Sequence, residues 1–71
     1  LNLIAAERMV RHLLEAINSL TTMPEMGRVA ANRIKNRELI IPFGARAYVI
    51  SYLIEKEAVI IVRIWHSNES R

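Results

Sequence analysis

Apolar residues recur at helical spacing through the first part of the chain. Between Ala5 and Leu20 they recur three or four positions apart, while charged and polar residues such as Glu7, Arg11 and Asn18 lie elsewhere on the helical wheel. The apolar positions are Met9, Val10, Leu13, Leu14, Ile17 and Leu20. Pro24 follows soon after, and proline disfavours helical geometry in the residue before it. The pattern predicts an amphipathic helix over residues 5–20 and a loop from about Thr21 to Asn36.

The second half of the chain has the apolar runs and short polar interruptions of β-strands. Three runs stand out: about Arg37 to Ile41, Ala47 to Ile54 and Ala58 to His66. Gly44 lies in the first connection, and Glu55-Lys56 is a short polar link compatible with a hairpin. The sequence therefore predicts an α+β domain in which a helical segment packs on a three-stranded antiparallel meander.

Period-two counting assigns side chains to the two faces of this sheet. In the last strand it places Ile60, Val62 and Ile64 on one face, and Val59, Ile61, Arg63 and Trp65 on the other. Both faces are largely apolar, yet a single helix can cover only one. The other face therefore needs a further segment or a partner chain, because large exposed apolar patches usually mark interaction sites.

Composition narrows the class of protein. The chain has 71 residues, enough for one small domain over residues 1–71, and 52% of them are hydrophobic. The chain begins at Leu1 without a methionine, and we expect that N-terminal residues precede it. Its net charge of +3 and its pI near 10 favour an acidic partner, either protein or nucleic acid.

Several classes of site find little support. The absence of cysteine excludes disulfides and thiolate chemistry, and two histidines are too few and too scattered to indicate a metal site. No cofactor motif is present. No apolar run is long enough for a membrane helix and no signal-peptide pattern occurs, so a soluble, cytoplasmic protein is expected.

The last strand carries the residues best suited to chemistry. Arg63, Trp65 and His66 follow a continuous apolar run. A histidine can transfer protons near neutral pH, and arginines can hold phosphate, as metal-free RNA cleavage requires. Trp65 could stack on a base or anchor a protein partner. The alternative is structural: His66 ends a strand, Arg63 extends from a half-buried face and Trp65 packs in the core. Further cations could extend the basic surface, namely Arg28, Arg37, Arg46 and Arg71.

Four segments in order resemble the RelE/ParE superfamily of bacterial toxins, best its ParE-like branch, whose members are often named plasmid stabilisation proteins. These segments are Pro24-Glu25-Met26-Gly27-Arg28, Arg37-Glu38-Leu39-Ile40-Ile41, Tyr48-Val49-Ile50-Ser51-Tyr52 and Ile61-Val62-Arg63-Ile64-Trp65-His66-Ser67. The resemblance covers nearly the whole chain. It implies a fold of one strand, two helices and a three-stranded antiparallel meander, with the first strand and most of the first helix missing here and an unpaired sheet edge left behind.

The resemblance also implies a type II toxin–antitoxin system and a hetero-oligomer with an acidic antitoxin that neutralises the toxin. ParE-like members poison DNA gyrase without established nuclease chemistry, whereas RelE-like members cut messenger RNA on the ribosome. The expected function is therefore ParE-like, acting on gyrase. A RelE-like endoribonuclease and a degenerate, non-toxic antitoxin-binding module are the alternatives, so enzymatic activity stays open.

Site residues follow from the same resemblance. RelE-like nucleases use a basic cluster with a late tyrosine or histidine. If the chain is a nuclease, His66 transfers protons, and Arg63 and Arg37 are the catalytic cations. Arg28, Trp65 and Arg71 are the expected binding residues. The chain departs from the nuclease pattern because it has only two lysines and no tyrosine after the last strand. That departure favours the ParE-like branch.

Overall fold

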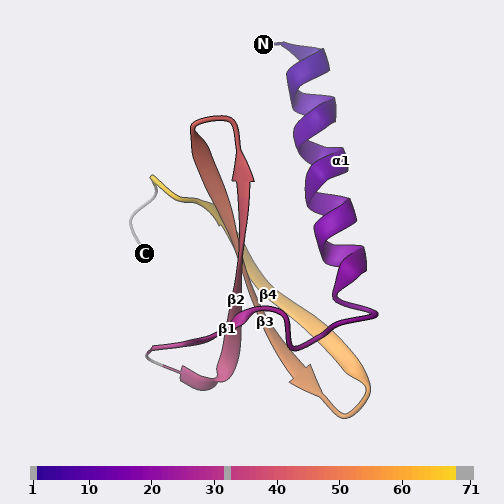
Figure 1. Ribbon diagram of the computed structural model, residues 1–71, viewed down its shortest axis with the longest axis vertical. Helices are drawn as coiled ribbons and strands as arrows, with labels where there is room; N and C mark the ends of the chain where they lie inside the picture. The colour runs from indigo at the N-terminus through magenta and orange to yellow at the C-terminus, as the bar shows by residue number, and fades with distance from the viewer. Residues whose placement is uncertain (1, 32, 69–71) are drawn as a thin grey trace.

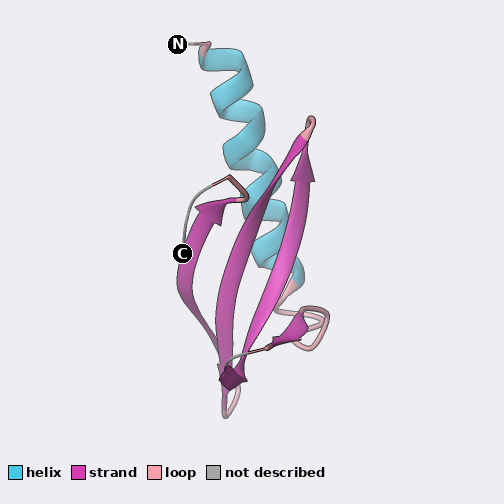
Figure 2. Cartoon of the chain, turned by 90° about the vertical axis from the view of Figure 1, so that its left-hand side faces the viewer, coloured by secondary structure: helices cyan, strands magenta, loops and turns pink. Residues whose placement is uncertain are grey.

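The computed structural model of the chain describes residues 2–31 and 33–68. They contain one helix and four strands. In order they are α1 (Leu3–Ser19), β1 (Arg28–Ala30), β2 (Arg33–Phe43), β3 (Arg46–Glu55) and β4 (Ala58–His66). The strands form one antiparallel sheet in the order β1-β2-β3-β4 (Figure 1). The helix lies behind one face of this sheet and leaves the other face open (Figure 2). The predicted α+β class is confirmed, with four strands instead of three.

Helix α1 forms where the periodicity predicts it. Asn2 caps its start, since the side-chain Oδ1 accepts hydrogen bonds from the backbone N–H groups of Ile4 and Ala5 at 3.0 and 3.2 Å. The exposed pair Glu7 and Arg11 adds an ion pair of 3.2 Å one turn apart. The helix ends at Ser19, close to the predicted boundary. In the described part of the chain, no helix is long and apolar enough to cross a bilayer.

The hydrophobic core lies between the last turns of α1 and the middle of the sheet. Leu20, Ile50 and Tyr52 have no exposed surface, and Ile41 is 5% exposed. Partly buried side chains from the helix and three strands surround them: Leu13, Ala16, Ile17, Leu39, Ile54, Val59 and Ile61. The helix is therefore attached to the sheet mainly through its C-terminal half.

The first turns of α1 extend past the end of the sheet (Figures 1 and 2). Large apolar side chains are exposed here and farther along the helix, with Leu3 at 72% in the first turn and Leu14 at 60% in the C-terminal half. These residues form a second apolar stripe beside the one that contacts the core. Helix packing thus uses only part of the apolar surface that the sequence provides.

A register shift in β4 changes the assignment of faces. Arg63 lies opposite Ser51 but Ile61 lies opposite Tyr52, so Val62 is an extra residue between the two pairs. Before the shift, Val59 and Ile61 face the helix and pack on the core, whereas Ile60 shares the open face with Arg63. The uniform alternation predicted for this strand is wrong, because period-two counting cannot detect a bulge. In β3 the alternation is regular: Ile50 and Tyr52 face the helix, and Ser51 faces the open side with its partners Glu38 and Arg63.

The segment predicted as a loop over residues 21–36 contains a strand. Arg28 and Val29 of β1 pair with Glu38 and Arg37 of β2, and β2 begins at Arg33, four residues before the expected boundary. That loop prediction is wrong because β1 has only three residues and carries no alternating pattern. Its pairing depends on contacts with the rest of the sheet rather than on local propensity.

Two-residue turns connect the longer strands. Gly44 supplies the positive φ of 64° between β2 and β3, but Lys56 adopts φ of 53° between β3 and β4. This left-handed conformation is costly for a residue with a Cβ atom. Replacing Lys56 with glycine is therefore expected to raise the free energy of unfolding by about 0.5–1 kcal/mol. Urea denaturation measures the gain, and Glu57→Gly, at the neighbouring turn position without a positive φ, should give none.

Candidate functional site

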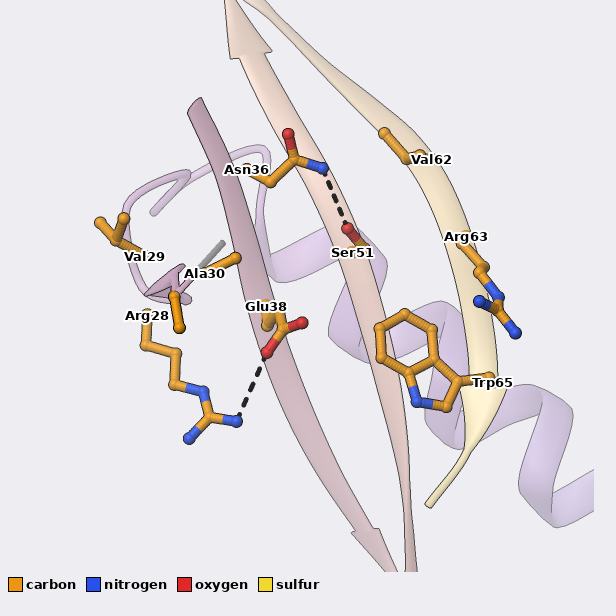
Figure 3. A pocket seen from close by; sticks show the side chains of 10 residues that line it. Arg28, Val29, Ala30, Asn36, Glu38, Ser51, Val62, Arg63 and Trp65 are labelled. Atoms are coloured by element: carbon orange, nitrogen blue, oxygen red, sulfur yellow. Dashed lines mark hydrogen bonds and ion pairs between the residues drawn. The ribbon is translucent and has the colours of Figure 1, made fainter. Parts of the chain in front are cut away.

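A pocket of about 590 Å³ lies on the open face of the sheet, opposite α1 (Figure 3). All four strands contribute to it. Its lining residues are Arg28, Val29, Ala30, Ala31, Asn36, Glu38, Ser51, Val62, Arg63 and Trp65. The antiparallel register explains this grouping, because Glu38 of β2, Ser51 of β3 and Arg63 of β4 are successive partners across the sheet.

Polar side chains form the floor of the pocket. Glu38 and Ser51 are each 8% exposed, although they lie on the face that no helix covers. Asn36 donates a hydrogen bond from Nδ2 to Ser51 Oγ at 3.4 Å. Arg28 reaches across from β1 and places its Nη2 3.4 Å from Glu38 Oε1. A buried carboxylate is stable only when it is paired, and Arg28 supplies that pairing.

Arg63 and Trp65 form the β4 side of the pocket. The Arg63 guanidinium lies over the Trp65 ring, 5.1 Å from its centroid, and Trp65 is 6% exposed. The tryptophan is thus a buried wall of the pocket and Arg63 an exposed cation above it. The formal charges of Arg28, Arg63 and Glu38 leave the pocket with an excess of positive charge. This arrangement can bind a small anionic group next to apolar surface.

His66 belongs to a different cluster, on the helix side of the sheet. Its ring meets Tyr48 edge-on at 5.2 Å, and the row of rings continues through Phe43 to His12 on α1. The backbone N–H of Asn68 donates to His66 Nδ1 at 3.1 Å, so the neutral imidazole carries its proton on Nε2. Packing on Tyr48 holds the imidazole on the helix side, away from the pocket.

A third group of side chains anchors the loop before β1. Tyr52 Oη donates to the Pro24 carbonyl at 2.7 Å and accepts from the Gly27 N–H at 2.9 Å. Arg37 Nη1 donates to the carbonyls of Gly27 at 2.7 Å and Glu25 at 3.2 Å. These bonds hold the chain just before Arg28, so they set where β1 begins and where the Arg28 side chain enters the pocket.

The structure brings together some of the residues expected in a site and separates others. Arg28, Arg63 and Trp65 line one pocket. His66 and Arg37 lie on the opposite face of the sheet, since they pair with Tyr48 and Tyr52. The three residues expected to act in a nuclease, His66, Arg63 and Arg37, are therefore not grouped. Arg46 is exposed at the start of β3, and Arg71 lies outside the described residues.

The floor of the pocket has no clear signature in the sequence. The pattern of residues places Asn36 in a loop and gives Glu38 and Ser51 no role. The available signal was a charged residue inside an apolar strand, since Glu38 precedes Leu39, Ile40 and Ile41. Among the described residues, no group of three or more His, Cys, Asp or Glu side chains could hold a metal ion.

The helix and the four-stranded antiparallel sheet fit the class of small RelE/ParE-type toxins. The sequence matches, over residues 1–71, the family described as the ParE toxin of the type II toxin–antitoxin system parDE. The chain belongs to this family. It is the toxin component of a type II toxin–antitoxin system, and its partner is an antitoxin.

Curated relatives from Caulobacter vibrioides support the same class. The chain is 43% identical to Toxin RelE1 over 67 residues, which cover 94% of this chain and 70% of the relative. It is 37% identical to Toxin RelE3 over 67 residues, or 94% of this chain and 71% of that protein. It is 38% identical to Toxin RelE2 over 64 residues, or 90% of this chain and 67% of that protein. No solved structure is a significant match.

Proposed function

We propose that this toxin is ParE-like: it inhibits DNA gyrase by binding, without nuclease chemistry of its own. The observation that carries the proposal is the separation of His66 from Arg63 on opposite faces of the sheet. The family match to ParE toxins supports the same branch. Gyrase is cytoplasmic, so the proposal also assigns the toxin to the cytoplasm.

Proton transfer requires close approach between the catalytic group and the substrate. A general acid or base must lie within about 3 Å of the proton it moves, directly or through one water. A phosphate held by Arg63 would lie on the open face, whereas the His66 imidazole packs on Tyr48 on the helix face. The sheet itself would separate the two groups. This geometry disfavours a shared catalytic site.

Arg37 is also poorly placed to stabilise a phosphate. Its Nη1 already donates to two backbone carbonyls of the loop before β1, at 2.7 and 3.2 Å. Moving the guanidinium to a substrate would break these bonds and release the loop. We assign Arg37 a structural role.

The alternative function is a ribosome-dependent messenger RNA endonuclease of the RelE type. The observation in its favour is the name of the three Caulobacter vibrioides relatives, each a RelE toxin at 37–43% identity. His66 would then have to act without Arg63, or with partners supplied by the ribosome. The two functions make opposite predictions for one substitution.

Replacing His66 with alanine is expected to leave toxicity within about twofold, because a toxin that acts by binding needs no proton transfer and most single truncations at an interface cost little affinity. A nuclease that used His66 for proton transfer would instead lose roughly 10²–10⁴-fold in cleavage. The measurement is growth inhibition on induction of the toxin, together with mapping of messenger RNA 5′ ends in a translating extract.

His12→Ala is the matched control, since His12 ends the same row of rings but lies on α1. Cuts within translated codons that disappear in His66→Ala and persist in His12→Ala would contradict the proposal. We expect both variants to remain toxic and the messenger RNA to stay intact. A wild-type protein that is folded, binds its antitoxin and is not toxic would instead identify a degenerate antitoxin-binding module.

A further inference from the structure

We infer that the pocket on the open face is the docking site for an acidic side chain of the antitoxin, bound between Arg28 and Arg63. The inference rests on the antitoxin partner of the family and is independent of the gyrase proposal. Figure 3 shows the two arginines on opposite sides of the pocket, with Glu38 and Ser51 between them.

The charge balance of the pocket favours one added carboxylate. Among the described residues the ion pairs are Glu7 with Arg11 and Glu38 with Arg28, so Arg63 has no carboxylate within 4.0 Å. Its guanidinium is exposed and lies 5.1 Å from the centroid of the Trp65 ring, a contact that favours this position of the side chain. A planar guanidinium can donate two parallel hydrogen bonds to one carboxylate.

The rest of the lining favours a peptide over a nucleic acid. Grooves for single-stranded nucleic acid supply several cations along the backbone of the ligand. Here the remaining walls are apolar, formed by Val29, Ala30, Ala31 and Val62, and Glu38 on the floor would repel a row of phosphates. Val29 and Val62 are 51% and 48% exposed, so apolar side chains next to the acidic residue would bury them. The fitting ligand is an extended segment with one acidic residue between apolar residues.

The test is a double-mutant cycle on the complex between this toxin and its antitoxin. Each Asp or Glu of the antitoxin is replaced by Asn or Gln, alone and against Arg63→Gln in the toxin, and the dissociation constant is measured. We expect Arg63→Gln to weaken binding by about 30-fold or more, because it leaves a partner charge buried and unpaired. One acidic residue should account for most of that loss and be coupled to Arg63.

Arg8→Gln is the matched control, since Arg8 is an exposed arginine on α1 away from the pocket. Its expected effect on the affinity is within about twofold. Because Arg63→Gln also removes the stacking on Trp65, Arg63→Lys is the second variant: it keeps the charge and should bind more tightly than Arg63→Gln. Thermal unfolding of each variant reports folding separately from binding.

Three outcomes would overturn the inference. Arg63→Gln could weaken antitoxin binding no more than Arg8→Gln does, or no acidic residue of the antitoxin could be coupled to Arg63. The third is that Arg63→Gln abolishes binding of RNA to the toxin but leaves its affinity for the antitoxin unchanged. Failure of the gyrase proposal is distinguishable, because inhibition of gyrase is read in a separate assay. If an antitoxin residue is coupled to Arg63 but the toxin does not inhibit gyrase, the docking site stands and the proposed target is wrong.

Discussion

Replacing Leu20 with alanine is expected to lower the free energy of unfolding by about 2–5 kcal/mol, the range for truncating a fully buried leucine. Leu20 has no exposed surface and lies where α1 meets the sheet, in contact with the core around Ile50 and Tyr52. The helix packs on the sheet mainly through this end. A domain of this size has little stability in reserve, so the variant should be largely unfolded at 37 °C. Thermal and urea unfolding followed by circular dichroism measure the change.

Leu14→Ala provides the matched control. It removes the same atoms from the same helix, but Leu14 is 60% exposed. The expected change is within about 0.5 kcal/mol, because alanine loses little burial there and has the higher helix propensity. Equal destabilisation by the two substitutions would mean that both faces of α1 are packed, contrary to the fold described above.

Replacing Gly27 with alanine is expected to lower the free energy of unfolding by about 3 kcal/mol, from overpacking and from disturbed hydrogen bonds. A Cβ atom at Gly27 would lie 2.6 Å from Tyr52 Oη and 3.0 Å from the backbone carbonyl oxygen of Glu38. Neither neighbour can easily move, because Tyr52 is fully buried and Glu38 belongs to β2. The loop would have to move away from Tyr52 and Arg37, and Arg28 would move with it.

Two further variants separate the contributions to this cost. Gly44→Ala tests backbone conformation alone, since Gly44 has φ of 64° and a Cβ there would meet nothing within 4 Å; its expected cost is about 1 kcal/mol. Tyr52→Phe removes the two hydrogen bonds of the Tyr52 hydroxyl and keeps the ring, at an expected cost of about 1–3 kcal/mol. If Gly27→Ala costs no more than Gly44→Ala, the close approach of Gly27 to Tyr52 is not a feature of the folded protein.

The elements with strong periodicity could be predicted from the sequence, and those that depend on tertiary contacts could not. Helix α1 and the cores of β2, β3 and β4 follow apolar patterns, and Gly44 marks a turn. Strand β1 has no pattern of its own. Its pairing depends on the bonds of Tyr52 and Arg37 to the preceding loop, and these join residues 10–28 positions apart in sequence.

The candidate site was predictable in composition but not in geometry. Arg63 and Trp65 were expected to share a face, and the structure places both in the pocket with Arg28. His66 follows Trp65 directly in the sequence, yet adjacent residues of a strand point to opposite faces. Proximity in the sequence therefore predicts one cluster of Arg63, Trp65 and His66, whereas the sheet separates His66 from the other two. To predict that Glu38 and Ser51 form the floor, one must know the register between β2 and β3, and no local pattern specifies that register.

Supercoiling of relaxed plasmid DNA by purified gyrase, in the presence of the folded toxin, distinguishes a gyrase inhibitor from a nuclease. We expect the toxin to inhibit supercoiling in proportion to its concentration, His66→Ala to inhibit equally well, and added antitoxin to restore gyrase activity. Unchanged supercoiling at toxin concentrations that cleave messenger RNA on ribosomes, with cleavage lost in His66→Ala, would contradict this expectation and identify a RelE-type nuclease.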